Sequence, residues 1–94
     1  MREDAINIFF KEIKYQPDIS PTLVSFYSAI LFCWNENDQC NPFNITRKKV
    51  MMLSRIQGIA TYHKCVRQLV SMGFIEYQPT YNKFIGSCVT LKKV

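Results

Sequence analysis

The stretch of sequence that decides the fold is TRKKVMMLSRIQGIATYHKCVRQLVSMGF, residues 46–74. It predicts two helices joined by a tight turn at residues 54–58. Thr46 is a residue type that caps helix N-termini, so the first helix is expected over residues 47–54. Over residues 59–72 the apolar positions recur at helical spacing, which predicts a second helix with one face in the core.

The pattern of the second helix separates a buried face from an exposed one. Its expected core residues are Tyr62, Cys65, Val66 and Leu69. The residues expected to face solvent lie between them and are Ala60, Thr61, His63, Lys64, Arg67 and Gln68. Gly73 can take the left-handed conformation of a Schellman cap, with Phe74 folding back on Leu69, so the helix is expected to end there.

Short strands are predicted on both sides of this pair of helices. Residues 43–45 alternate between apolar and polar types, and residues 74–78 and 87–91 have the composition of strands. The loop between the last two strands, residues 79–86, is longer than a tight hairpin turn, and long hairpin loops are often functional. Strand, helix, turn, helix and hairpin form the order of a winged helix-turn-helix.

Two further helices are predicted before this unit. Residues 3–14 place apolar side chains at helical spacing with charged residues between them. Ser20 and Pro21 are typical of a helix start, and that helix is expected to run to about residue 35. It is apolar nearly all round, so it has to be covered by the rest of the core, by the N-terminal helix or by a second subunit.

The length of 94 residues and the hydrophobic content of 48% predict one domain with a core of its own. The expected fold is α+β but mostly α, a winged helix-turn-helix with an extra N-terminal helix. Residues 1–19 are expected to form a helical extension and residues 20–94 the winged-helix core. No apolar run approaches the roughly 18 residues needed to cross a membrane. Acidic residues lie near the start of the sequence, where an export signal would be positively charged. A cytoplasmic protein is therefore expected.

The helix-turn-helix region is similar to a known family. The stretch ATYHKCVRQL, residues 60–69, closed by MGFI, residues 72–75, resembles the recognition helix of winged-helix regulators and its exit into the wing. Residues 46–94 as a whole resemble the DNA-binding core of these regulators, which include repressors of the multiple-antibiotic-resistance type. The segment 41–87 also looks like small winged-helix proteins carried on bacterial mobile elements. These resemblances imply double-stranded DNA as the partner.

Charge is segregated along the chain. The first forty residues sum to −3 and the remainder to +8, which gives the net charge of +5. The cations from residue 41 onward are Arg47, Lys48, Lys49, Arg55, Lys64, Arg67, Lys83, Lys92 and Lys93, against the single acid Glu76. Such segregation is typical of a surface that binds nucleic-acid phosphate. A solvated basic face without a partner is the alternative.

The candidate DNA contacts fall into three groups. Arg47, Lys48 and Lys49 occupy the first turn of a helix, where the helix dipole disfavours cations and a bound phosphate would offset that cost. The major groove admits one helix, so the exposed face of the second helix is expected to read bases. Asn82 and Lys83 in the hairpin loop are expected to contact the DNA backbone or the minor groove.

Other chemistries find little support in the sequence. There is no Gly-rich phosphate loop, and the acids lie away from His63, so no enzyme is expected. The four cysteines, Cys33, Cys40, Cys65 and Cys88, include no CxxC motif and match no common zinc spacing. They are expected to be reduced and mostly buried, and neither metal nor cofactor is expected. A structural metal site that includes His63 is the alternative.

A homodimer is expected to form through the N-terminal third of the chain. Ile6, Phe9, Phe10 and Ile13 form an apolar stripe, and the helix after Ser20 is apolar nearly all round. Together they would expose more apolar surface than monomers usually do. In the alternative, the first helix folds back over the second and completes a monomer. The expected function is sequence-specific transcription regulation. The alternatives are a replication or partition accessory factor of a plasmid or integrative element, and a winged helix used for protein contacts.

Overall fold

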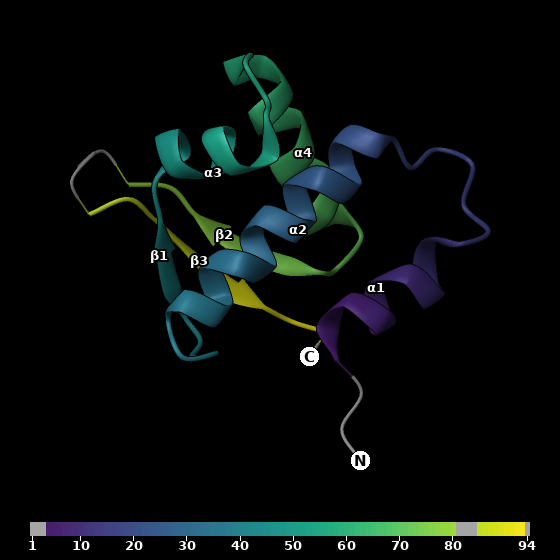
Figure 1. Ribbon diagram of the computed structural model, residues 1–94, viewed down its shortest axis with the longest axis horizontal. Helices are drawn as coiled ribbons and strands as arrows, with labels where there is room; N and C mark the ends of the chain where they lie inside the picture. The colour runs from purple at the N-terminus through teal and green to yellow at the C-terminus, as the bar shows by residue number, and fades with distance from the viewer. Residues whose placement is uncertain (1–3, 81–84, 94) are drawn as a thin grey trace.

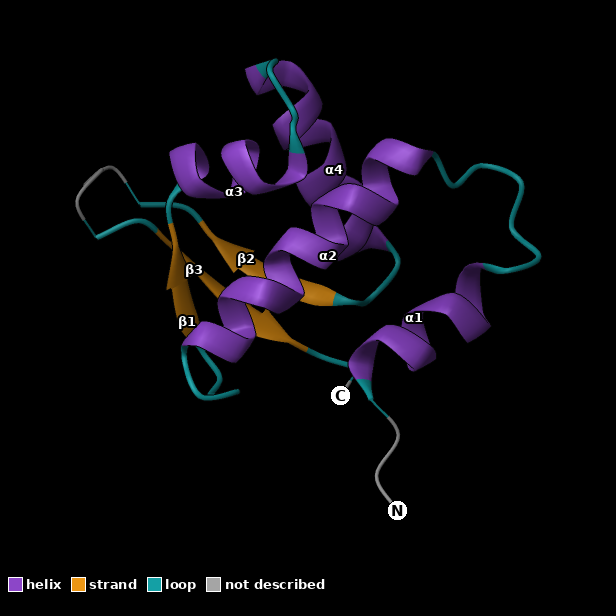
Figure 2. Cartoon of the chain, viewed as in Figure 1, coloured by secondary structure: helices purple, strands orange, loops and turns teal. Residues whose placement is uncertain are grey.

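The computed structural model describes residues 4–80 and 85–93. In that part of the chain, four helices and a three-stranded antiparallel sheet form a compact α+β fold of which about half is helical (Figures 1 and 2). In chain order the elements are α1 (Ala5–Ile13), α2 (Pro21–Glu36), β1 (Phe43–Ile45), α3 (Arg47–Ser54), α4 (Ile59–Ser71), β2 (Ile75–Gln78) and β3 (Ser87–Leu91). None of the described helices is long and apolar enough to span a bilayer.

The sheet has the strand order β1-β3-β2, so the last strand lies between the first two. Val89 at the centre of β3 is opposite Phe43 on one side and Tyr77 on the other. Alternate side chains of β1 and β3 are buried, as expected for strands that cover a core with one face. α2 contacts this sheet as well as α3 and α4, and it crosses the middle of the molecule (Figure 2).

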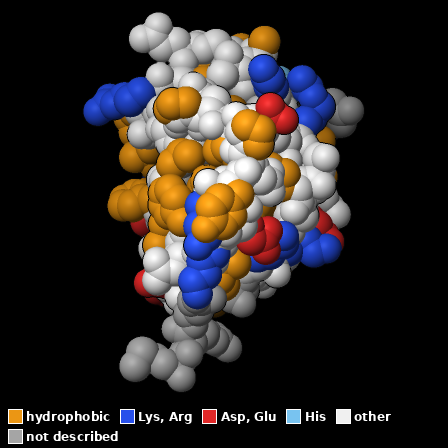
Figure 3. Space-filling view, turned by 90° about the vertical axis from the view of Figure 1, so that its right-hand side faces the viewer, with side chains coloured by type: hydrophobic (Ala, Val, Ile, Leu, Met, Phe, Trp, Pro, Cys, Tyr) orange, Lys and Arg blue, Asp and Glu red, His pale blue; other side chains and the backbone are white. Residues whose placement is uncertain are grey.

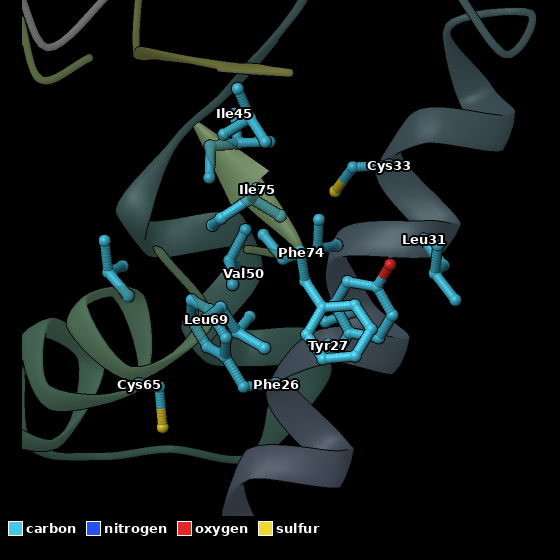
Figure 4. Close-up of a cluster of buried hydrophobic side chains, with 14 of the residues drawn as sticks. Phe26, Tyr27, Leu31, Cys33, Ile45, Val50, Cys65, Leu69, Phe74 and Ile75 are labelled. Atoms are coloured by element: carbon cyan, nitrogen blue, oxygen red, sulfur yellow. The ribbon is translucent and has the colours of Figure 1, made fainter. Parts of the chain in front are cut away.

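The core is rich in aromatic rings contributed by every layer. The ring of Phe9 lies 4.4 Å from that of Tyr27 and 5.1 Å from that of Phe74, measured between centroids. Phe26 and Tyr62 meet edge to face at 5.4 Å. Figure 4 shows side chains of α2, α3, α4 and the sheet converging on this centre. These contacts join the N-terminal helix to the C-terminal half of the chain.

The predicted helices and strands are confirmed to within two residues at each end. Ser20 caps α2, because its Oγ accepts a hydrogen bond from the Leu23 amide at 3.1 Å. The end of α4 is the predicted Schellman cap, with Gly73 at a φ of 80° and the Phe74 amide donating to the Leu69 carbonyl at 3.0 Å. These signals are local in sequence, which is why the sequence revealed them.

The N-terminal helix folds back over α2 within the single chain. Of the four residues expected at a dimer interface, Phe9 and Ile13 are buried in the chain's own core, and Ile6 is half-buried against it. Phe9 and Ile13 therefore cannot contact a second subunit, and the predicted dimer interface is wrong at these two residues. Phe10 remains 46% exposed. Figure 3 shows hydrophobic side chains still gathered on this side of the molecule.

Candidate nucleic-acid interface

The helix α4 presents the outward face that its sequence predicts. Tyr62, Cys65, Val66 and Leu69 are all buried, which confirms the predicted core face. Ala60, Thr61, His63, Lys64 and Arg67 are exposed, and Gln68 is half-buried. The N-cap residue of α4 is Gly58, which has no side chain to accept a hydrogen bond from the first amides of the helix. A polar, cationic helix face with no acid among its residues is thus free for a partner.

The N-terminus of α3 carries the three predicted cations on its exposed side. Thr46 caps this helix, its Oγ1 accepting a hydrogen bond from the Lys49 amide at 3.2 Å. Arg47 and Lys48 form no ion pair within the described part of the chain. Lys49, in contrast, donates to the Glu36 carboxylate at the end of α2, and this hydrogen bond raises the pKa of the lysine. Lys49, which was expected to bind phosphate, is therefore already paired with a carboxylate of the same chain.

Two other cations of the basic half of the chain, residues 41–94, also form ion pairs. Lys92 lies 3.2 Å from Glu76, and Lys93 lies 2.6 Å from Glu12 of α1. Lys93 also donates to the carbonyl of Met72 at 3.3 Å and lies 4.6 Å from the centre of the Phe74 ring. It thus ties the two ends of the chain together. From residue 41 onward, the cations that stay unpaired among the described residues are Arg47, Lys48, Arg55, Lys64 and Arg67.

The base of the hairpin loop lies against the start of α3. Gly86 has a φ of +79°, and a Cβ there would overlap the carbonyl oxygen of Ile45 and contact the Thr46 side chain. Ile45 is also paired with Ser87 in the sheet. The loop therefore leaves the sheet beside the N-terminus of α3. Its predicted contact residues Asn82 and Lys83 lie outside the described residues.

The turn between α3 and α4 forms a feature that the sequence did not reveal. Arg55 ends α3 in the left-handed conformation, with a φ of 62°. Beside it is an open hollow of about 480 Å³, lined by Pro21, Thr22, Ser25, Ser54, Arg55, Ile56, Gln57 and Thr61. Arg55 is the one ionisable side chain of this lining. A left-handed arginine is not encoded by a glycine or asparagine signal, so the turn chemistry was not readable.

Residues 4–80 and 85–93 hold no candidate metal site. No three His, Cys, Asp or Glu side chains are grouped there so that they could hold a metal ion. Burial raises the pKa of the Cys33 and Cys65 thiols, which keeps both protonated and poorly nucleophilic. His63 is exposed on α4, with its ring 5.3 Å from that of Tyr62.

Comparison with known proteins gives no relative for this chain. No family model matches it, and neither the curated proteins nor the solved structures contain a significant match. Function is therefore inferred from the geometry and charge of the chain itself.

Proposed function

We propose that this protein binds double-stranded DNA as a winged-helix protein and acts as a sequence-specific transcription regulator. The observation that carries the proposal is the charge of the α3–α4 unit. Residues 47–71 contain no acid, and five unpaired cations lie on their surface. A concentration of unpaired positive charge on one pair of helices attracts phosphate more than it attracts other common partners.

The order and contacts of the elements support the winged-helix assignment. A strand, two helices and a hairpin follow one another, and the first strand pairs with the last. In such an arrangement α4 enters the major groove, where Thr61 and Lys64 near its N-terminus reach base edges. Arg47 and Lys48 then hold the phosphate backbone at the positive end of α3. Asn82 and Lys83 of the hairpin loop are proposed to contact the flanking backbone or minor groove.

A protein-docking module is the second candidate, and one observation favours it. Met52 and Ile59, on either side of the α3–α4 turn, are 58% and 50% exposed. A protein partner would use such apolar side chains, whereas DNA phosphate would not. The five unpaired cations around them are the reason that DNA is preferred here. A replication or partition factor would bind DNA through the same face and differs only in the location of its site.

The proposal is tested by the salt dependence of binding to duplex DNA. If about three to five phosphates are neutralised per subunit, log affinity should fall with log salt at a slope of about −3 to −4.5. Selection of bound sequences from random duplexes at one defined salt concentration then tests sequence specificity. Binding that does not depend on salt, or no binding at low salt, rejects the proposal.

A pair of charge reversals provides the matched control. Lys48→Glu and Lys14→Glu change the net charge equally, but Lys14 lies at the end of α1, where its ammonium is 5.1 Å from the centre of the Tyr15 ring. We expect Lys48→Glu to weaken binding about tenfold or more and to make the salt slope shallower by about 1, since one phosphate contact is lost. Equal effects of the two reversals would show that net charge alone, and no defined surface, accounts for binding.

A further inference from the structure

Three hydroxyl groups form a chain at the place where α4 meets the hairpin. The phenol oxygens of Tyr62 in α4 and Tyr77 in β2 are 3.1 Å apart, and Tyr77 donates to Ser87 Oγ in β3 at 2.9 Å. Because the one hydroxyl proton of Tyr77 points to Ser87, Tyr62 donates to Tyr77. Tyr77 is the central member, because it bonds to both of the others.

The residues around the three hydroxyl groups hold them in a defined geometry. Tyr62 is fully buried, and its ring meets that of Phe26 edge to face. Burial, followed by the hydrogen bond to Tyr77, raises the pKa of Tyr62 well above its ordinary value, while the charge of Arg47 opposes this rise. The phenol therefore stays neutral and remains a donor at every physiological pH.

The position of the chain in the fold suggests what it does. α4 is joined covalently to β2 only at its far end, through Gly73 and Phe74. At the loop end of the hairpin, Ser87 is paired with Ile45, which directly precedes the cap of α3. The hydroxyl chain thus ties α4 to both strands of the hairpin at the end from which the loop leaves.

We propose that Tyr62, Tyr77 and Ser87 position the hairpin relative to α4, so that both engage DNA in one geometry. The inference rests on the proposed function, because it assigns these residues a role in DNA binding. A helix and a hairpin held at a fixed angle lose less conformational entropy on binding than two elements that move independently. Tyr77 is a positioning residue in this scheme and does not itself contact DNA.

The test compares Tyr77→Phe with Ser25→Ala. Each substitution removes a side-chain hydroxyl that bonds across elements, but the Ser25 hydroxyl donates to the Ser54 carbonyl at 2.8 Å, at the opposite end of α3. Residual dipolar couplings of backbone amides measure the angle between α4 and the β2–β3 hairpin in the free protein. Hydroxyl-radical footprints on a selected duplex then map the DNA protected by each variant.

We expect Tyr77→Phe to spread or change the angle between α4 and the hairpin, and to reduce DNA affinity about three- to tenfold. Protection should be lost at the flank of the site while the base preference set by α4 is kept. Ser25→Ala should change neither the angle nor the footprint. An unchanged angle and an unchanged footprint in Tyr77→Phe would overturn the positioning role alone. If the unaltered protein binds no duplex, the proposed function is wrong, and so is the role of the three hydroxyl groups in DNA binding.

Discussion

Tyr27 and Tyr62 are both fully buried, but only the phenol of Tyr62 has a hydrogen-bond partner in the described part of the chain. A buried hydroxyl that is left unsatisfied costs about 1–3 kcal/mol. We therefore expect Tyr27→Phe to raise the free energy of unfolding by about 1 kcal/mol and Tyr62→Phe to lower it by about 1 kcal/mol. Urea unfolding of both variants measures these changes. Destabilisation by Tyr27→Phe would contradict the reasoning.

Tyr27 also makes the free energy of unfolding depend on pH in the alkaline range. Burial, and secondly the charge of Glu12, raises the pKa of Tyr27 from 10.0 to about 12. Between these values the unfolded chain has lost the phenolic proton and the folded chain has kept it. The stabilising contribution is therefore complete below about pH 10 and is lost as the pH rises towards about 12. Unfolding measured over this range should show a shallower decline in Tyr27→Phe than in the unaltered protein.

Lys49 forms an ion pair with Glu36, so in the proposed DNA complex this acid would compete with phosphate for the lysine. We expect Glu36→Gln to strengthen DNA binding and to make the log–log salt slope steeper by about 0.9, the value for one further phosphate. Glu12→Gln is the control, because it changes the net charge equally but releases Lys93, which other contacts hold near the end of α4. Titrations at several salt concentrations separate the two. If both variants gain affinity equally, Lys49 is not a phosphate ligand.

At the scale of elements, the hairpin depends on one glycine. A Cβ at Gly86 would overlap the Ile45 carbonyl oxygen, and its φ of +79° is strained for other residues. We expect Gly86→Ala to lower the free energy of unfolding by about 2 kcal/mol or more. Gly58→Ala should cost less than about 1 kcal/mol, because Gly58 is an N-cap without positive φ and its Cβ would make an ordinary contact. Thermal unfolding compares the two, and equal losses would contradict the expected steric conflict.

The two helices of the candidate interface are expected to have different roles. Lys48 at the start of α3 should hold phosphate, so Lys48→Glu should weaken binding to all sequences uniformly. Thr61 on α4 should face a base, so Thr61→Ala should change which sequences are preferred. A binding profile over many duplexes is measured for each variant. Identical changes in the two profiles would refute this division of roles.

Much of the element pattern was predictable because its signals are local. Caps at Ser20, Thr46 and Gly73 and the apolar spacing of α4 each involve residues within one or two helical turns. The interactions that the sequence did not reveal join distant residues. Lys49 pairs with Glu36 across thirteen positions and Lys93 with Glu12 across eighty-one, and no local pattern encodes such partners. The sequence therefore overestimated how many cations of the basic half are free.

At the scale of the whole molecule, the ion pairs reduce the unpaired positive charge of the basic half but do not remove it. Lys92 and Lys93 are paired and lie after β3, away from the loop end of the hairpin. The remaining unpaired positive charge of the described residues in the basic half is confined to α3, α4 and the turn between them. A smaller but more localised positive surface favours a defined orientation on DNA over nonspecific attraction.

The apolar surface of α1 and α2 supports the proposal that the protein forms a homodimer. Burial of Phe9 within the chain removes part of the expected interface, but Phe10 and Phe32 remain 46% and 48% exposed. Two copies joined through these helices would set two α4 helices about one turn of DNA apart, roughly 34 Å, on an inverted repeat. We expect the intact protein to sediment as a dimer at tens of micromolar and Phe10→Glu to sediment as a folded monomer. Phe9→Glu should instead unfold the chain, because a charge at this fully buried position has no partner. Circular dichroism distinguishes the two variants, and a folded monomer for the intact protein would remove both the dimer and the inverted-repeat site.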